Sequence, residues 1–374
     1  MTNFNYVASC LFGLEKFVGE EIDDCGGKRT ETIDGRVYFT GNEDVLAKAN
    51  INLRTAERVF IELAKFRAET FTELFDGVKD IPWEQFVRKD DAFPVKGHSI
   101  KSALYSIPDC QSIIKKAVVE RLKSAYRIDW FEETGTKYQI EFFILNDIVS
   151  IMLDTSGVAL HKRGYRTESG AAPIRETLAA ALVKISRPRE DVRLWDPFCG
   201  SGTIPIEAAL IMTNTAPGLF RHFSAENYTF LNKNIWKNAR EEAISAIKTD
   251  SRFIAYGSDI DKNVLKTAQE NVKRARMDKF VKLNYADALN IKNDGVRTTI
   301  VCNPPYGERL DSIREARELY KKMGDVFPNL APWQIYIITS EEEFEKLYGK
   351  KADKVRKLYN GMLKCGYYQY FKNN

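Results

Sequence analysis

The feature that most constrains the fold is a regular alternation of apolar strand-like segments and helix-like segments in the second half of the chain. From Val192 onward the strand-like segments are VRLWD, FIAYGSD, VKLNYAD, TTIVCN and WQIYIIT, and a helix-like stretch follows each. Such alternation predicts a doubly wound, mostly parallel sheet with helices on both faces, a Rossmann-like α/β fold. A later segment, GMLKCGYYQYF, predicts another strand, and residues 214–250, which contain Trp236, interrupt the alternation as an insertion.

Polar residues end four successive strands of this predicted sheet. They are Asp196, Asp259, Asp287 and Asn303. Functional groups of open α/β sheets gather at the carboxyl ends of the strands, where an acidic residue can hold a ribose diol and another can reach an adenine amine. A single aspartate there is usually a helix cap, but four polar ends in succession indicate a ligand site.

The first of these ends opens a glycine-rich turn, DPFCGSGT, which runs from Asp196 to Thr203. Gly200 and Gly202 allow a ligand to approach the backbone closely. The turn lacks the third glycine of the dinucleotide fingerprint and the lysine of a P-loop. Its leading carboxylate suits a ligand that carries an ammonium group, although a plain helix-entry loop is an alternative for such a turn taken alone.

The fourth end continues as IVCNPPYGERL. Pro304 and Pro305 have no N–H and have a fixed φ, so this loop is rigid and rich in acceptors. The Asn303 side-chain oxygen and the Pro304 carbonyl suit the two N–H donors of an exocyclic amine, and Tyr306 suits stacking on its base. These features predict a rigid loop that can orient an amine next to an aromatic ring.

The scarcity of other catalytic groups supports this hypothesis. The chain has only three histidines, and its six cysteines contain no C-x-x-C pair. We therefore expect no metal site and no histidine base. For Cys199 and Cys302 we favour the role of small buried residues. No apolar run reaches the ~18–20 residues of a membrane helix, and the N-terminus does not resemble a signal peptide, so we expect a cytoplasmic protein without membrane contact.

The first half predicts two smaller α+β units. NYVASCLF, GRVYFTG and ERVFIELAKF are strand-like, LEKFVGEEIDDCGG and NEDVLAKANINL are helix-like, and Asn42 is a plausible cap of the latter helix. TKYQIEFFILNDIVSIMLDTSG predicts two strands with a turn at Asn146-Asp147, and APIRETLAAALVKI predicts a helix that opens near Pro173. The expected domains are a ferredoxin-like unit at 1–65, a second unit at 66–165, and the Rossmann-like unit at 166–374.

One helix of the second unit is basic. Residues 96–127 hold seven basic and two acidic side chains. In SIIKKAVVERLKSAYR the apolar residues share one face, and the opposite face carries Lys116, Lys123 and Arg127. The apolar face is Ile114, Val118, Leu122 and Ala125. The basic stripe fits a solvated helix face or a row of phosphate contacts, and alone it does not distinguish them.

Taken in order, DPFCGSGT, an acidic strand end, AD and NPPYG resemble the class I S-adenosylmethionine (SAM)-dependent methyltransferases that act on exocyclic amines. NPPYGERL, with LHKRGYR and APIRETLAAAL upstream, resembles a narrower family. That family is the THUMP-domain RNA methyltransferases related to the enzyme that makes N2-methylguanosine in 23S ribosomal RNA. Its 23S-type members are similar in carrying an insertion between the glycine loop and the acidic end, and in this chain Asp259 lies 63 positions after Asp196.

The resemblance implies that residues 66–165 form a THUMP domain, that SAM is the cofactor and that RNA is the partner, with no metal. It also implies a stand-alone enzyme of the N-terminal-module type, since the chain ends without the second methyltransferase module of some members. The implied catalytic residues are Asn303, Pro304, Pro305 and Tyr306. The implied cofactor residues are Asp196, Pro197, Phe198, Cys199, Gly200, Ser201, Gly202, Thr203, Asp259, Ile260, Asp287, Ala288 and Asn303. The candidate RNA contacts are Lys116, Lys123, Arg127, Lys162, Arg163 and Arg166.

The leading hypothesis is therefore a guanine-N2 methyltransferase of 23S ribosomal RNA. The alternatives are a tRNA guanine-N2 enzyme, an adenine-N6 nucleic-acid methyltransferase, and a non-catalytic RNA-binding assembly protein that keeps the cofactor fold. The sequence leaves open which nucleotide is methylated, whether the substrate is naked RNA or an assembly intermediate, and the oligomeric state.

Overall fold

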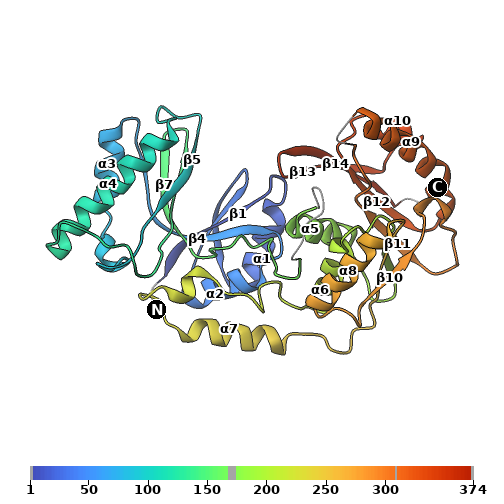
Figure 1. Cartoon of the computed structure of the whole chain (residues 1–374), viewed down its shortest axis with the longest axis horizontal. Coiled ribbons are helices and arrows are strands. Elements are labelled where there is room, and N and C mark those ends of the chain that lie inside the picture. Colours follow the sequence, from blue (N-terminus) through green and yellow to red (C-terminus); the bar gives the residue numbers. More distant parts are fainter. Residues whose placement is uncertain (1–2, 167–173, 308–309, 372–374) are drawn as a thin grey trace.

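The computed structural model describes residues 3–166, 174–307 and 310–371, and these form two seven-stranded sheets, one in each half of the chain (Figure 1). Pro173, Glu308 and Arg309, which belong to the motifs above, lie outside the described residues. The predicted order of an α+β half followed by a Rossmann-like half is confirmed.

The N-terminal sheet is continuous across the two predicted N-terminal units. Its strand order is β2-β3-β1-β4-β7-β6-β5. The long strand β4 pairs with β1 on one side and with β7 on the other, so one strand belongs to both units. The strands are β1 Phe4–Cys10, β2 Lys28–Ile33, β3 Arg36–Gly41, β4 Ala56–Arg67, β5 Val95–Ile100, β6 Ile140–Leu145 and β7 Ile148–Asp154.

Four α-helices pack on this sheet, and local chemistry fixes their ends. Asn42 caps α2, because its side-chain oxygen accepts from the Val45 N–H at 3.1 Å. Thr70 and Glu73 form a capping box at α3. The predicted turn at Asn146-Asp147 is confirmed, with φ of +49° and +64° at these residues. The helices are α1 Glu15–Asp24, α2 Glu43–Asn52, α3 Phe71–Lys79 and α4 Ile107–Tyr126, with a 3-10 turn η1 at Trp83–Gln85.

The C-terminal sheet has the order β10-β9-β8-β11-β12-β14-β13. Its first five strands are parallel, and β14 is antiparallel to both of its neighbours, as expected for a mostly parallel sheet. The order reverses direction at β8, which is the kind of switch point where such sheets bind ligands. The strands are β8 Arg193–Asp196, β9 Ala255–Asp259, β10 Val281–Tyr285, β11 Thr298–Cys302, β12 Gln334–Thr339, β13 Lys354–Asn360 and β14 Leu363–Tyr370.

Helices cover both faces of this sheet and bury two apolar cores. One core joins the strands to α5 and α6, and the other joins them to α9 and α10. The helices are α5 Glu176–Ser186, α6 Thr203–Met212, α7 Asn234–Ser245, α8 Lys262–Arg274, α9 Leu310–Val326 and α10 Phe344–Tyr348. The described residues of this half also form 3-10 turns, which are η2 Ser224–Asn227, η3 Ala288–Asn290 and η4 Phe327–Leu330.

The insertion at 214–250 packs on the N-terminal half rather than on the sheet that it interrupts. Its buried apolar residues, Trp236 and Tyr228 among them, join the core of the N-terminal sheet. The Tyr228 ring stacks on Tyr138 with the centroids 4.4 Å apart. Helix α7 of the insertion lies along α2 at the base of the N-terminal half (Figure 1). The insertion therefore fastens the two halves together.

Candidate active site

The four polar strand ends lie in one row, because β10, β9, β8 and β11 are neighbours in the sheet. Asp196 and Asp259 end β8 and β9, Asn303 follows the last residue of β11, and Asp287 lies two residues beyond β10. Neighbouring strands are about 4.8 Å apart, so the row from β10 to β11 spans about 14 Å. The structure thus brings together side chains that are more than 100 residues apart in the sequence.

The glycine-rich turn connects two members of this row, Asp196 and Asp259. The Gly200 N–H donates to Oδ2 of Asp259 at 3.0 Å. Gly200 has a φ of +51°, and a Cβ there would meet nothing within 4 Å, so the backbone faces open space. Gly202 has a φ of +83° and precedes α6. The turn therefore offers a ligand close access to its backbone at the switch point of the sheet.

Asp196 is buried, with 1% of its surface exposed. Its Oδ1 accepts from the Phe198 N–H at 3.0 Å. Burial raises the pKa of the Asp196 carboxyl well above its usual value, and the nearby charge of Asp259 raises it further. A cation placed next to this carboxyl would favour its ionised form, which suits a ligand with an ammonium group.

The carboxylates of Asp259 and Asp287 can each accept further hydrogen bonds from a ligand that lies along the row. Asp259 uses its other oxygen, Oδ1, for the Asp261 N–H at 3.0 Å, and a carboxylate has about four acceptor positions in all. Asp287 is exposed, and its Oδ1 caps η3 through the Leu289 N–H at 2.9 Å. Ile260, next to Asp259, is 65% exposed, and Ala288, next to Asp287, is buried. Carboxylates next to an exposed apolar side chain fit a nucleoside.

The Asn-Pro-Pro-Tyr loop is closed on itself in this structure. The Tyr306 hydroxyl donates to the Asn303 Oδ1, the oxygen expected to receive an amine. The Tyr306 ring packs against the core next to α5 and α6 instead of standing free. Burial raises the pKa of Tyr306 well above its usual value, so this hydroxyl stays protonated and remains a donor. For Tyr306 to stack on a base, its hydrogen bond with Asn303 must break.

Two positioning residues of the site were missed from the sequence. Tyr320 of α9 is fully buried, and its hydroxyl donates to the Pro305 carbonyl at 2.7 Å while contacting Thr339 Oγ1 at 2.9 Å. Asn271 of α8 is also buried, and its amide donates to the Ser201 carbonyl at 2.9 Å. Neither residue lies in a motif, and only the folded chain brings them to the two loops.

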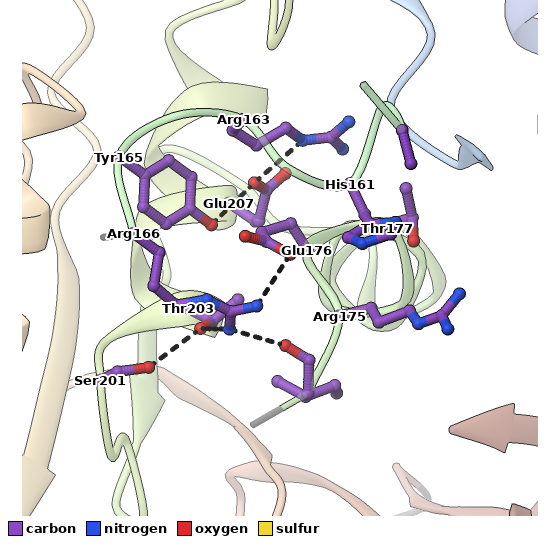
Figure 2. Close-up of polar contacts among 12 residues, drawn as sticks. His161, Arg163, Tyr165, Arg166, Arg175, Glu176, Thr177, Ser201, Thr203 and Glu207 are labelled. Carbon is purple, nitrogen blue, oxygen red and sulfur yellow. Dashed lines mark hydrogen bonds and ion pairs between the residues drawn. The ribbon is translucent and has the colours of Figure 1, made fainter. Parts of the chain in front are cut away.

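Arg166 fastens the start of α5 to the glycine-rich turn, as Figure 2 shows. Its guanidinium pairs with Glu176 Oε2 at 3.1 Å, donates to the Ile174 carbonyl at 3.1 Å and contacts Thr203 Oγ1 at 3.4 Å. Next to it, Arg163 Nε lies 3.5 Å from Glu207 Oε1. Only 2% of the Arg163 side chain and 12% of the Arg166 side chain are exposed.

These positions correct part of the predicted RNA surface. Arg163 is buried next to Glu207, and Arg166 is largely covered in its ion pair with Glu176, so neither guanidinium is free to contact phosphate in this structure. Lys162, which precedes Arg163, is exposed. Lys116 and Arg127 are exposed and Lys123 is half-buried on α4, and none of them forms an ion pair with any residue that the structure describes. Ala125, expected on the buried face of this helix, is exposed near its end.

The fold and the row of strand ends define a methyltransferase of class I. Residues 163–369 match the family described as "RMKL-like, methyltransferase domain". Residues 5–60 match the RlmL ferredoxin-like domain, and residues 68–154 match the THUMP domain. The chain belongs to this family of RMKL-like methyltransferases with a ferredoxin-like and a THUMP domain.

Similar proteins agree with this assignment. YpsC of Bacillus subtilis (strain 168), named as an unproven RNA methyltransferase, is 43% identical to this chain. The match covers 99% of this chain and 97% of the YpsC chain. The ribosomal RNA large subunit methyltransferase K/L of Shewanella baltica (strain OS155) is 31% identical over 97% of this chain. The match covers 52% of that relative, so this chain spans about half of its length. One similar crystal structure is that of SMU.472, described as an unproven methyltransferase complexed with SAH (S-adenosyl-L-homocysteine). It superposes with a TM-score of 0.93 at 38% sequence identity, and the match covers 100% of this chain and 99% of that one.

Among the helices that the structure describes, none has the length and apolar character needed to cross a membrane.

Proposed function

We propose that this chain is an RNA methyltransferase that transfers a methyl group from SAM to the exocyclic N2 of a guanosine in the large ribosomal RNA. The observation that carries the proposal is the row of Asp196, Asp259, Asp287 and Asn303 at the switch point, with the open glycine turn beside it. The RNA assignment is supported by the THUMP domain and by the name of the K/L relative.

The cofactor residues divide the row between them. Asp259 accepts from the ribose diol, Asp287 and the exposed Ile260 hold the adenine end, and buried Asp196 favours the ammonium end. Gly200 lets the ligand approach its backbone. Bound SAM would supply an electrophilic methyl group on a sulfonium centre; it would leave as the neutral thioether SAH, and the methylated nitrogen would release one proton to solvent.

The catalytic loop orients the nucleophile. The Asn303 Oδ1 and the Pro304 carbonyl accept the two N–H groups of the amine, which directs the nitrogen lone pair toward the methyl group. The target amine takes the place that the Tyr306 hydroxyl has on Asn303 in this structure. The freed Tyr306 ring stacks on the base, a contact typically worth ~1–3 kcal/mol.

Asn303→Ala and Tyr306→Ala test this assignment. Each should leave SAH binding within about twofold and lower methyl transfer to ribosomal RNA by roughly 100-fold or more, as when a group that orients charge in the transition state is lost. Asn329→Ala, on η4 away from the loop, is the matched control and should keep full activity. Transfer by Asn303→Ala at the wild-type rate would contradict the mechanism.

Labelled SAM and total RNA from cells that lack the protein test the substrate. We expect N2-methylguanosine in the large ribosomal RNA, identified by mass spectrometry after fractionation by size. Label in tRNA would keep the chemistry and change the substrate, and N6-methyladenosine would keep the role of Asn303 and change the base. Failure to bind SAH would overturn the catalytic assignment and favour a binding protein.

A further inference from the structure

The tip of the β13–β14 hairpin carries an unusually exposed apolar side chain. Met362 is 98% exposed, the highest value among the large apolar residues that the structure describes, and Leu363 beside it is 46% exposed. Asn360 pairs with Leu363, so Gly361 and Met362 form a two-residue turn. Gly361 has a φ of +63°. Met362 therefore stands at the apex of a short hairpin.

This hairpin contacts the catalytic loop directly. The Cys365 Sγ of β14 lies 4.0 Å from the Tyr306 hydroxyl. Met362, in the turn before β14, is three residues from Cys365, which is about 10 Å of extended chain. The apex and the Asn-Pro-Pro-Tyr loop thus belong to one edge of the sheet, and one bound strand of nucleic acid can touch both.

The hairpin is also basic and well supported. Lys354, Lys357 and Lys364 are exposed on it, and of these only Lys364 has an ion-pair partner in the described chain, Glu342 at 3.5 Å. Its other side contacts the N-terminal half, where the Tyr359 and Phe12 rings lie 5.7 Å apart, edge to face. Figure 1 shows β13 and β14 on the side of the sheet that faces the N-terminal half.

We propose that the β13–β14 hairpin is a wedge that opens the RNA at the target guanosine, with Met362 entering the stack as the base leaves it. This inference rests on the proposed function and adds how the base reaches the site. Flexible apolar side chains such as Met are used as wedges between bases. A paired guanine must be flipped out, which costs several stacking and pairing contacts, and an apolar apex replaces part of the lost stacking. The free lysines on the hairpin suit the flanking phosphates.

The test compares Met362→Ala with the wild type on two short RNAs under single-turnover conditions. Both RNAs carry the guanosine found by the labelling experiment, paired with cytosine in the first and opposite an abasic site in the second. The variant should be about tenfold slower on the paired RNA, equivalent to about 1.4 kcal/mol, and unchanged within about twofold on the abasic one. Ile244→Ala, at an apolar residue of α7 that is 55% exposed, is the control and should change neither rate.

Each outcome decides the proposal. Selective loss on the paired RNA supports the wedge. Equal loss on both RNAs, or no loss on either, overturns it while the proposed function stands, because the wild type still methylates RNA. A change of oligomeric state in Met362→Ala, seen by size-exclusion chromatography, would mean that the apex contacts a second copy of the chain. This result would also overturn the wedge proposal. If the labelling experiment finds no methylated guanosine, the proposed function fails and the wedge fails with it.

Discussion

At the scale of single residues, the raised pKa of Asp196 couples cofactor binding to pH. Burial raises this pKa in the free protein, so at any pH below the raised pKa the carboxyl is mostly neutral where a cationic ammonium is expected to bind. The cation favours the ionised form, so binding releases a proton. Affinity should therefore rise with pH through the Asp196 pKa and level off above it.

Titration calorimetry of SAH binding across pH checks this prediction. Asp196→Asn keeps an acceptor for the Phe198 N–H but cannot ionise, so its affinity should be weaker at high pH and its pH slope flatter. Asp109→Asn, at an exposed carboxylate of α4, should keep the wild-type slope. An affinity that falls as pH rises would contradict the coupling.

At the scale of elements, α9 holds the catalytic loop through one hydroxyl. Tyr320→Phe removes the donor to the Pro305 carbonyl and keeps the ring in its core. We expect kcat to fall about tenfold with SAH affinity unchanged, because small displacements of orienting groups are costly. Tyr370→Phe is the matched control, since it removes a similar hydrogen bond, to the Lys350 carbonyl. This variant should lower the free energy of unfolding and leave kcat unchanged. A similar loss of kcat in both variants would mean that Tyr320 acts only through stability.

Burial separates β11, which the sequence predicted, from β2 and β13, which it missed. β11 is buried throughout, and its apolar run identified it. β2 and β13 lie at sheet edges and are largely exposed, so their charged sequences, KRTETI and KVRKLYN, carry no apolar pattern. The row of strand ends was predictable because parallel strands end at one edge. Contacts such as Tyr320 to Pro305 were not, because they depend on how helices pack.

At the scale of the whole molecule, the stability of the N-terminal half depends on residues from the methyltransferase half. Trp236 of the insertion is 3% exposed, stacks on Phe223 with the centroids 5.5 Å apart and belongs to the N-terminal core. A backbone hydrogen bond of 2.9 Å from Gly218 to the Ile51 carbonyl joins the same parts, as does the ion pair of Lys48 with Glu242 at 2.7 Å. Two domains that share a core in this way should unfold together.

Trp236→Ala should therefore lower the free energy of unfolding by about 3–5 kcal/mol, the usual cost of removing a buried tryptophan. Because α7 packs along α2 and the two halves should unfold together, hydrogen exchange should accelerate both in Glu43–Asn52, almost 200 residues away in the sequence, and in β11 of the methyltransferase core. Trp130→Ala, at a tryptophan that is 76% exposed, should change stability by no more than about 0.5 kcal/mol. Faster exchange confined to the insertion itself would show that the insertion only rests on the N-terminal half, because a shared core transmits the loss to both of its sides.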